Sequence, residues 1–491
     1  MSDTEARRRD GLIAARNAMI VGASLLVTWS LALIVRLLLP RHLGPDLLGE
    51  YTFADALAMN GMTFLGLGID SYIQKEIPKR QEHAGDFFLG VQTLRALASL
   101  IVLAIVAGIA WSGGHRGEVI WTTVFFGVAQ LCMIAANTTA TLLYAVRRVG
   151  RLSALNIGTK ILWGSIVVVG LVLHAPLRVY ALASVASEAV RLVALVVIAR
   201  RAAGLELALH VGRTATALRK SVPFYVSSVA QVLYSRIDIA VMGLALPERE
   251  VGWYGAATNL SFIAMMVAPI MTWVLMPQLA RAAAKSRDEL MIGLRSALEM
   301  TFIVAIGLAT LIGSGADIIV HLALGSRFDQ AIPAMRVLSP IFVVVYVAML
   351  GATTLVLLHR EWFVTVVTLV SFALNAGLNV ALLGPSLRRF GDGGGGIGAA
   401  AISVAVEALV AGTFLYVIGR DAFDRRTLST LAKCVLAAVV VLVVDHFGYG
   451  LGSWRIVATA LTYFVVVVGT RALRLGELFA LLRASLKERG G

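Results

Sequence analysis

The sequence predicts an all-α membrane protein with about 14 transmembrane helices, arranged as two six-helix lobes around a central cavity, plus two C-terminal helices. Composition supports this, because 58% of the residues are hydrophobic and 15% charged, whereas soluble domains carry about 25% charged residues. Apolar runs of about 20 residues recur along the whole chain. In addition, the pattern Gly-x-Tyr-x-x-Ala-x-x-Leu occurs at Gly49–Leu57 and again, 203 positions later, at Gly252–Leu260. Such a repeat is typical of a transporter with its pathway between two halves.

Each copy of the repeat follows a proline-containing hinge, with Pro40 and Pro45 before the first and Pro247 before the second. Arginines precede the first apolar run, as in a signal peptide, but the run over 17–39 is too long for that, and we expect a retained membrane helix. The predicted spans are 17–39, 52–74, 86–111, 118–146, 152–173, 177–200, 220–244, 252–277, 292–314, 330–358, 362–384, 397–419, 427–447 and 453–473.

The loop charges test this count of spans. With a cytoplasmic N-terminus, 28 Lys and Arg residues fall in segments on the cytoplasmic side and 8 on the opposite side. Such a bias fixes orientation and places both termini in the cytoplasm. A missed or an invented helix would invert every later loop, so the bias supports an even number of spans. It also accounts for the net charge of +14 without a nucleic-acid partner.

The connections predict where the lobes begin and end. The longest cytoplasmic link lies between the sixth and seventh spans, where two halves should be joined. We expect an N-terminal lobe at 1–200, a linker at 201–220, a C-terminal lobe at 221–420, and two extra spans with a basic cytoplasmic tail at 421–491. The two lobes are then parallel repeats in a pseudo-two-fold arrangement. The tail from Leu473 to Leu486 alternates apolar and basic residues and suits either an interfacial helix or a solvated segment.

Motifs for catalysis or for nucleotide and metal binding are missing from the sequence. It contains no HExxH, GxSxG or Walker motif. Cys132 and Cys434 lie in apolar runs and give no metal-ligand spacing. The glycine-rich stretch Gly391–Gly398 follows no strand and lacks a P-loop lysine, so we expect a flexible outer loop rather than a phosphate cradle. We therefore predict a protein that is not an enzyme and uses no cofactor or metal.

Charged residues inside the predicted spans are the candidates for function, because a charge at membrane depth is costly and by default marks a pathway. The basic residues are Arg36, Arg95, Lys160, Arg191, Arg236 and Arg336. The acidic residues are Asp55, Asp70, Glu188, Asp238, Glu299 and Glu407.

Position along each span separates these residues. Arg36, Asp55, Asp70 and Arg336 lie within about two turns of a span end, where long side chains can reach the interface. Glu188 and Arg191 are three residues apart, so they share a helix face and can form a structural ion pair. The remaining groups lie deeper.

A cavity rich in arginine and lysine suits an anionic substrate, because guanidinium groups bind phosphate through charge-assisted hydrogen bonds. The predicted substrate-binding residues are Arg95, Lys160, Arg191, Arg236 and Arg36. The predicted charge-balancing or coupling residues are Glu188, Asp238, Glu299 and Asp55. Protons or sodium ions could drive the cycle, and the sequence favours neither.

Several segments resemble a known family. They are the stretch from Asn17 to Arg36, RHLGPDLLGEYTFADAL at 41–57, LGLGIDSYIQKEI at 65–77, FYVSSVAQVLYSRIDIAVMG at 224–243, VGWYGAATNL at 251–260 and VLMPQLARA at 274–282. Together they resemble the polysaccharide transport family of the multidrug, oligosaccharidyl-lipid and polysaccharide exporter superfamily.

This resemblance implies a flippase of the bacterial cytoplasmic membrane that moves polyprenyl-diphosphate-linked oligosaccharide by alternating access for surface polysaccharide biosynthesis. Polysaccharide polymerases or glycosyltransferases would be its partners. A lipid II flippase has the same architecture and remains an alternative. A multidrug exporter is less compatible, because its cavity should be dominated by acidic groups. A membrane glycosyltransferase or polymerase would need a larger aqueous loop than this sequence offers.

Overall fold

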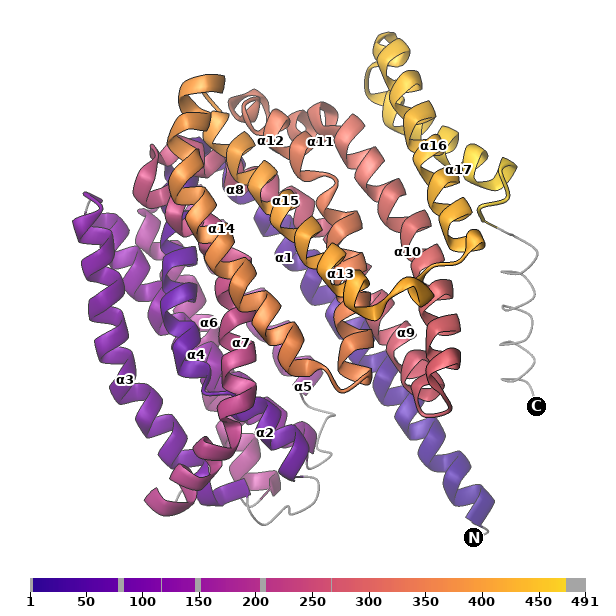
Figure 1. Ribbon diagram of the computed structural model, residues 1–491. Helices are drawn as coiled ribbons and strands as arrows, with labels where there is room; N and C mark the ends of the chain where they lie inside the picture. Colours follow the sequence, from indigo (N-terminus) through magenta and orange to yellow (C-terminus); the bar gives the residue numbers. More distant parts are fainter. Residues whose placement is uncertain are drawn as a thin grey trace. The chain divides into compact units, whose positions relative to one another are not determined.

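A computed structural model describes residues 3–77, 84–115, 117–145, 152–203, 209–265 and 267–473 (Figure 1). Throughout these ranges the ordered elements are helices, and no strand occurs. The chain divides into two compact units, Met1–Gly252 (unit 1) and Trp253–Gly491 (unit 2). The predicted all-α class is therefore confirmed, and each unit is described by itself below.

Unit 1 contains seven α-helices and the first turn of an eighth within the described ranges. They are α1 (Asp3–Met62), α2 (Ile69–Glu76), α3 (Ala84–Ser112), α4 (Gly117–Ala145), α5 (Leu152–Val172), α6 (Leu177–Ala203), α7 (Val211–Ala245) and the start of α8 (Glu248–Met265).

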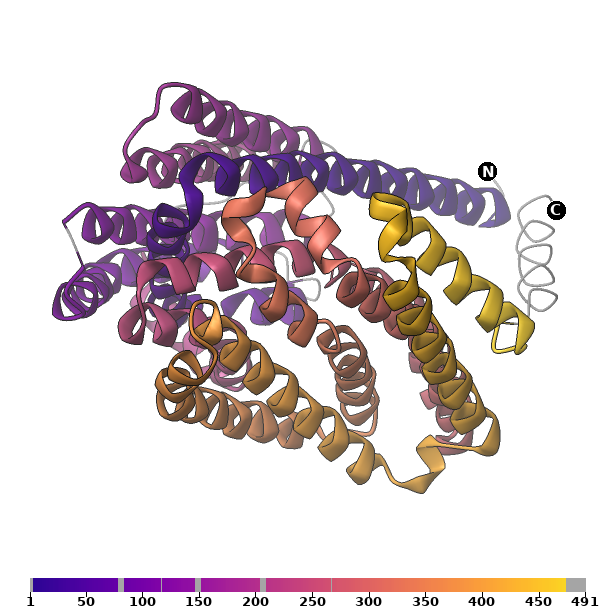
Figure 2. The same cartoon turned by 90° about the horizontal axis from the view of Figure 1, so that it is seen from above.

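The helix α1 runs through the predicted proline hinge instead of ending there. Pro40 and Pro45 both lie within it, and the backbone leaves helical geometry at Gly44, with φ 74° and ψ 176°. Only glycine adopts this conformation readily, so the change of direction is made at Gly44. Figure 2 shows the long first part of α1 and the turn near its end.

The predicted second span, 52–74, is wrong as a single continuous helix. α1 ends at Met62, a 3₁₀ turn covers Thr63–Gly66, and α2 begins only at Ile69. Leu67 and Gly68 between them have left-handed backbone conformations. This break leaves backbone carbonyl groups without helical partners, and a buried arginine described below donates hydrogen bonds to two of them.

Two hydrophobic clusters lie in the core of unit 1 among the described residues. One joins α2, α3, α4 and α6 through side chains such as Ile73, Phe87 and Leu143. The other joins α1, α5 and α6 through Val35, Tyr180 and their neighbours. In contrast, large apolar side chains on the outer face of α3 are exposed, which suits contact with lipid rather than water.

Unit 2 contains the rest of α8 and nine more α-helices in its described part. They are α9 (Val267–Ala283), α10 (Arg287–Ser314), α11 (Ala316–Ala323), α12 (Ala331–Leu338), α13 (Ile341–Leu357), α14 (Glu361–Phe390), α15 (Gly394–Ile418), α16 (Arg425–Phe447) and α17 (Arg455–Gly469), with 3₁₀ turns at Ser326–Phe328, Arg420–Ala422 and Gly448–Trp454. Its main hydrophobic cluster joins α10, α13, α15, α16 and α17. The helices α16 and α17 form a hairpin against α10 (Figure 1).

Two expectations for unit 2 need correction. The predicted span 330–358 is two helices, because α12 ends at Leu338 and α13 begins at Ile341. The glycine-rich stretch is not a flexible loop along its whole length, since α15 already begins at Gly394. A Cβ on Gly396 would lie 3.3 Å from the Cβ of Ala334. Glycine there permits close packing of α15 on α12.

Ten helical segments of the described part are long and apolar enough to cross a membrane. They include α12 and α13 taken together, and α16 and α17 taken together, but not α1, α8 or α9. A multi-pass membrane protein is thus confirmed, whereas the number fourteen stays a prediction.

Some predicted features lie outside the described residues. They are the tail beyond Leu473, the middle of the linker at 204–208, and the loop arginines and lysines at 78–83, 116 and 146–151. The compact units divide at Gly252, so that α7 packs within unit 1, on α1, α2 and α3. The predicted lobe boundaries concern the sequence repeat and remain a prediction.

Candidate functional site

The kink in α1 brings charged residues from its two parts together. Arg36 precedes Gly44, and Asp55 follows it, 19 residues after Arg36. On a straight helix they would be roughly 28 Å apart. In the structure Asp55 lies within electrostatic range of Arg36 and also of Arg236 on α7. Tyr51 joins the same group, one turn before Asp55.

Asn60 connects α1 to α7 beside this group. Its side-chain amide donates a hydrogen bond to the backbone carbonyl of Arg236 at 3.2 Å. The Oδ1 atom of Asn60 is buried and has no hydrogen-bond partner in the described part of the chain. A buried acceptor without a donor is costly, so this position suits a polar ligand or water.

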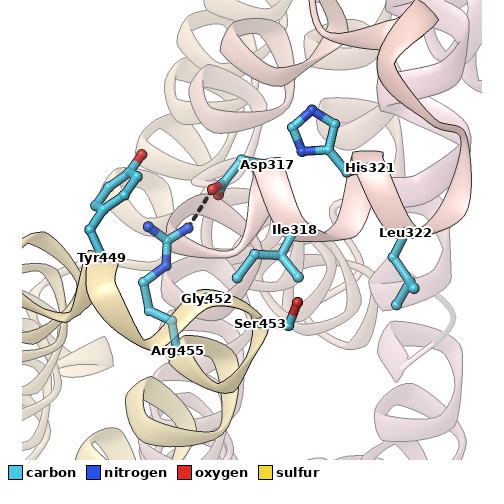
Figure 3. Close-up of a pocket in the computed structure, with 8 residues that line it drawn as sticks. All are labelled: Asp317, Ile318, His321, Leu322, Tyr449, Gly452, Ser453 and Arg455. Atoms are coloured by element: carbon cyan, nitrogen blue, oxygen red, sulfur yellow. Dashed lines mark hydrogen bonds and ion pairs between the residues drawn. The ribbon is translucent and has the colours of Figure 1, made fainter.

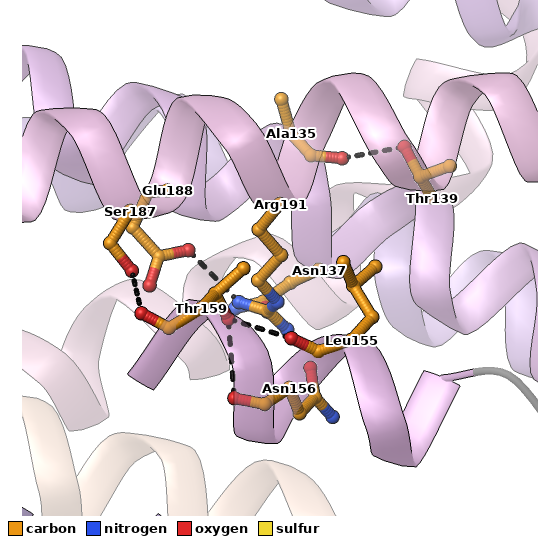
Figure 4. Close-up of polar contacts among 9 residues, drawn as sticks. All are labelled: Ala135, Asn137, Thr139, Leu155, Asn156, Thr159, Ser187, Glu188 and Arg191. Atoms are coloured by element: carbon orange, nitrogen blue, oxygen red, sulfur yellow. Dashed lines mark hydrogen bonds and ion pairs between the residues drawn. The ribbon is translucent and has the colours of Figure 1, made fainter. Parts of the chain in front are cut away.

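A second charged group lies between α4, α5 and α6 (Figure 4). Arg191 donates to Glu188 Oε2 at 3.0 Å, as predicted from their spacing, and its other terminal nitrogen donates to Asn137 Oδ1 at 2.9 Å. The Nε atom of Arg191 is buried and lacks an acceptor among the described residues. Ser187 and Thr159 join α6 to α5 next to this group through a hydrogen bond of 2.8 Å.

Lys160 on α5 connects the two groups. It lies within electrostatic range of Glu188 and Arg191, and also of Arg36. We call the combined set the basic cluster. Its members are Arg36, Lys160, Arg191 and Arg236, with the carboxylates of Asp55 and Glu188. Four cations from four helices and two anions therefore form one chain of groups within electrostatic range in unit 1, in which Arg191 and Glu188 are in direct contact.

Arg95, another predicted substrate ligand, has a different environment. Its side chain is completely buried, with 0% exposure. It donates to the carbonyl oxygens of Leu65 and Gly66 at 2.7 Å each and to the Thr138 hydroxyl at 2.9 Å, and that hydroxyl donates to Asp70. Arg95 thus caps the carbonyl groups freed by the break between α1 and α2. These contacts give it a structural role.

The two remaining predicted carboxylates make contacts of a different kind. Asp238 on α7 accepts a hydrogen bond from the backbone N–H of Ile239 at 2.8 Å. Glu299 lies in unit 2, where it pairs with Arg426 at 3.0 Å. The predicted residues that the structure brings together are therefore Arg36, Lys160, Arg191, Arg236, Asp55 and Glu188.

Unit 2 contains its own charged group, which we call the Arg455 cluster (Figure 3). Arg455 is 3% exposed and pairs with Asp317 on α11 and with Asp445 on α16, the latter at 3.0 Å. Arg336 pairs with Asp317 at 3.5 Å, and the Arg455 guanidinium lies 4.3 Å from the centre of the Tyr449 ring. The cluster borders a cavity of about 460 Å³. It joins α11, α12, α16 and α17, and its charges balance.

The sequence pattern did not identify the uncharged polar residues of the site. Asn137, Asn60 and Tyr51 contact or adjoin the charged groups, but a search restricted to ionisable residues at membrane depth passes over amides. An asparagine within an apolar span is itself an unusual signal, since its amide needs partners. In the described ranges no set of three or more His, Cys, Asp or Glu side chains could hold a metal ion.

Comparisons with known proteins identify a sequence relative and solved structures of similar fold. A curated relative, the "Probable low-salt glycan biosynthesis flippase Agl15" of Haloferax volcanii, is 24% identical over 420 residues, covering 82% of this chain and 83% of that protein. A structure of lipid II flippase MurJ in an inward closed conformation matches with a TM-score of 0.71 at 10% identity, covering 94% of this chain and 100% of that one. An inward-facing multidrug resistance MATE family transporter of the MOP superfamily matches with a TM-score of 0.61 at 15% identity, covering 80% and 93%.

The solved structures share the fold, and the sequence gives the family. Residues 14–283, more than half of the chain, match the family described as "Polysaccharide biosynthesis protein". The matched region includes all of the basic cluster. The chain therefore belongs to the polysaccharide biosynthesis protein family, as its resemblance to polysaccharide transporters indicates.

Proposed function

We propose that this chain is a flippase of the cytoplasmic membrane that moves oligosaccharide linked to a polyprenyl diphosphate from the inner to the outer leaflet, for surface polysaccharide biosynthesis. The observation that carries the proposal is the basic cluster, in which four cationic side chains from α1, α5, α6 and α7 lie within electrostatic range of two carboxylates or of one another. The name of the relative from Haloferax volcanii, a glycan biosynthesis flippase, supports the same substrate class.

The excess of positive charge favours a diphosphate over a neutral or cationic substrate. Two positive charges remain after Asp55 and Glu188 are counted against the four cations. A lipid diphosphate supplies at least two negative charges and several acceptor oxygens, and arginine binds such oxygens in pairs. The unpartnered Nε of Arg191 is a donor that the substrate can satisfy.

The carboxylates of the cluster balance part of its charge while no substrate is bound. Asp55 lies within electrostatic range of Arg36 and Arg236, and Glu188 pairs with Arg191. A proton or sodium ion exchanging at one of them would link transport to an ion gradient. Arg95, with its contacts filled, and Glu299, paired with Arg426, are left out of the proposed substrate site.

The proposed topology follows the loop charges. Fourteen spans place both termini in the cytoplasm, with lobes at 1–200 and 221–420 that alternate in opening the pathway. No catalytic step is needed for transport, so we propose a transporter rather than an enzyme. A multidrug exporter is disfavoured, because organic cations would meet the cationic excess of the cluster.

Transport in proteoliposomes tests the proposal. The double variant Arg36→Gln/Arg236→Gln should lower flipping of a fluorescent polyprenyl-diphosphate oligosaccharide at least a hundredfold, since charge-assisted hydrogen bonds contribute about 1.5–3 kcal/mol each. The matched control is Arg178→Gln, which removes an exposed arginine of unit 1 that pairs with Glu118. Unchanged flipping by the double variant would refute the proposed site. Transport of lipid II in preference to other glycans would support the alternative substrate.

A further inference from the structure

A cavity outside the basic cluster lies at the end of unit 1 that faces the cytoplasm in the proposed topology. Its volume is about 480 Å³, within the range of about 300–1,000 Å³ that is typical of sites for small molecules. It lies where the start of α7 packs on α2 and on α3 (Figure 1). We call it the linker cavity, because the α7 residues that border it, between Gly212 and Lys220, fall within the predicted linker.

The linker cavity has a fixed apolar floor. Ile77, Phe87 and Ala217 border it and belong to the buried hydrophobic cluster that joins α2, α3, α4 and α6. At its edge, Asp86 on α3 pairs with Arg213 on α7. The packed floor and this ion pair hold α7 against α3, so the shape of the cavity is set before any ligand binds.

The polar groups of the linker cavity differ from those of the basic cluster in their balance of charge. Two carboxylates and two cations border the cavity, namely Glu76, Asp86, Arg213 and Lys220. They supply hydrogen-bond acceptors as well as donors, and their charges balance. Tyr72 and Phe87 add aromatic surface, with ring centres 5.7 Å apart and planes at 76°. The lining therefore suits a polar ligand that is uncharged and has apolar faces.

Sugars have this chemistry. Each sugar hydroxyl both donates and accepts hydrogen bonds, and the C–H groups of the ring form an apolar face that packs on aromatic side chains. A phosphate is disfavoured, because it would face both carboxylates. We propose that the linker cavity binds sugar units of the lipid-linked oligosaccharide on the cytoplasmic side, separately from the diphosphate. This inference rests on the proposed transport function and adds a second subsite for the same substrate.

The positions of the two subsites on α7 determine which sugars reach the linker cavity. Lys220 and Arg236 lie on this one helix, 16 residues and roughly 24 Å apart along its axis. With the diphosphate at the basic cluster, the first sugar stays beside that cluster, and only sugars farther from the lipid extend to the cavity. The linker cavity therefore recognises the outer part of the oligosaccharide and makes affinity depend on its length.

Equilibrium binding to the purified full chain in detergent tests the proposal. The probes are the lipid-linked oligosaccharide extracted from the native membrane, a polyprenyl diphosphate that carries one hexose, and the same lipid without sugar. The wild type should bind the oligosaccharide lipid at least tenfold more tightly than either shorter lipid, because one hydrogen bond to a charged group contributes about tenfold or more.

Two variants impair the linker cavity in different ways. Glu76→Gln removes a charged acceptor at constant size. Gly212→Trp fills space, because a Cβ there would meet no described atom within 4 Å, and replacing a helical glycine does not weaken α7. Each should abolish the preference for the oligosaccharide lipid and leave the affinity for both shorter lipids unchanged. The matched control is Gly108→Trp on α3, where a Cβ also meets nothing within 4 Å; it should bind all three lipids as the wild type does.

The outcomes separate this inference from the proposed function. Arg36→Gln/Arg236→Gln should weaken binding of all three lipids. If it does not, the diphosphate site is wrong, and the difference between long and short lipids still tests the linker cavity. Equal affinity of the wild type for all three lipids would overturn the inference. So would a preference for the oligosaccharide lipid that survives in both cavity variants, or an equal loss of affinity for the lipid with one sugar.

Discussion

The basic cluster of unit 1 and the Arg455 cluster of unit 2 both combine arginine with carboxylate side chains, but they differ in the balance of charge. In the Arg455 cluster two arginines meet two aspartates, Asp317 and Asp445, and the central guanidinium is 3% exposed. In the basic cluster four cations lie within electrostatic range of one another and of two carboxylates, so the named cations outnumber the named anions. Under the proposed function, the cluster with unbalanced charge binds the substrate, whereas the balanced Arg455 cluster holds helices together.

The comparison predicts its largest effect on stability at Arg455. Replacing Arg455 by Gln leaves Asp317 and Asp445 without their buried partner, and breaking such a pair costs about 3–5 kcal/mol. We expect the unfolding midpoint in detergent to fall by several degrees, with transport per folded molecule unchanged. Arg389→Gln, at an exposed arginine of α14, is the control. A stable Arg455→Gln protein that fails to transport would place this cluster on the transport pathway. The two clusters would then no longer differ in role.

Asn137 gives a smaller and more specific effect. It accepts a hydrogen bond from Arg191 at 2.9 Å, so Asn137→Ala should weaken diphosphate-lipid binding about tenfold by freeing that guanidinium to turn. Asn137→Asp keeps an acceptor in place but neutralises more of the cluster, and we expect it to bind more weakly still. Titration of each variant with the diphosphate lipid measures these affinities and gives their order. If the aspartate variant binds the lipid as tightly as the wild type does, the excess of positive charge does not determine the affinity of the site.

Asp424 gives the smallest effect and lies outside both clusters. It caps α16, where its carboxylate accepts from the backbone N–H of Thr427 at 2.7 Å. That bond holds the pKa of Asp424 below its ordinary value. Because the folded-state pKa is lowered, the stabilisation is present above the unfolded carboxyl pKa of about 3.9 and is lost as pH falls through the folded value.

Asp424→Ala should cost about 1 kcal/mol at neutral pH, and the difference from wild type should shrink as the pH falls from the unfolded carboxyl pKa toward the lower folded pKa. Thermal unfolding measured between neutral pH and about pH 3 checks both parts. The same difference at every pH would show that the carboxylate contributes nothing through its charge.

Much of the fold could be predicted from the sequence, because its signals are local. Apolar runs of membrane length predicted most of the helices, and the three-residue spacing of Glu188 and Arg191 predicted their ion pair. The interruption at Thr63–Gly68 could not be predicted, since the run 52–74 is apolar enough to continue as one helix. The kink depends on the backbone dihedral angles of Gly44. The neighbouring prolines predicted its position only approximately.

The site was harder to predict, because it depends on contacts between distant residues. Depth in a span ranked Arg95 with Arg191, yet the partners of Arg95 are the carbonyls of Leu65 and Gly66, 30 and 29 residues earlier. Arg36 is peripheral by depth, but the kink in α1 brings it within electrostatic range of Asp55 and Arg236. Spacing along one helix shows which residues share a face of that helix. It does not show which distant residues that face contacts.

Equilibrium binding of lipid phosphates tests the central claim most directly. Purified protein in detergent is titrated with a polyprenyl diphosphate and with the matching monophosphate, for the wild type and for Arg36→Gln/Arg236→Gln. We predict that the wild type prefers the diphosphate at least tenfold and that the double variant loses the preference, with Arg178→Gln unchanged. Equal affinity of the wild type for both lipids, or a preference that survives in the double variant, would contradict the assignment of the basic cluster as the diphosphate site.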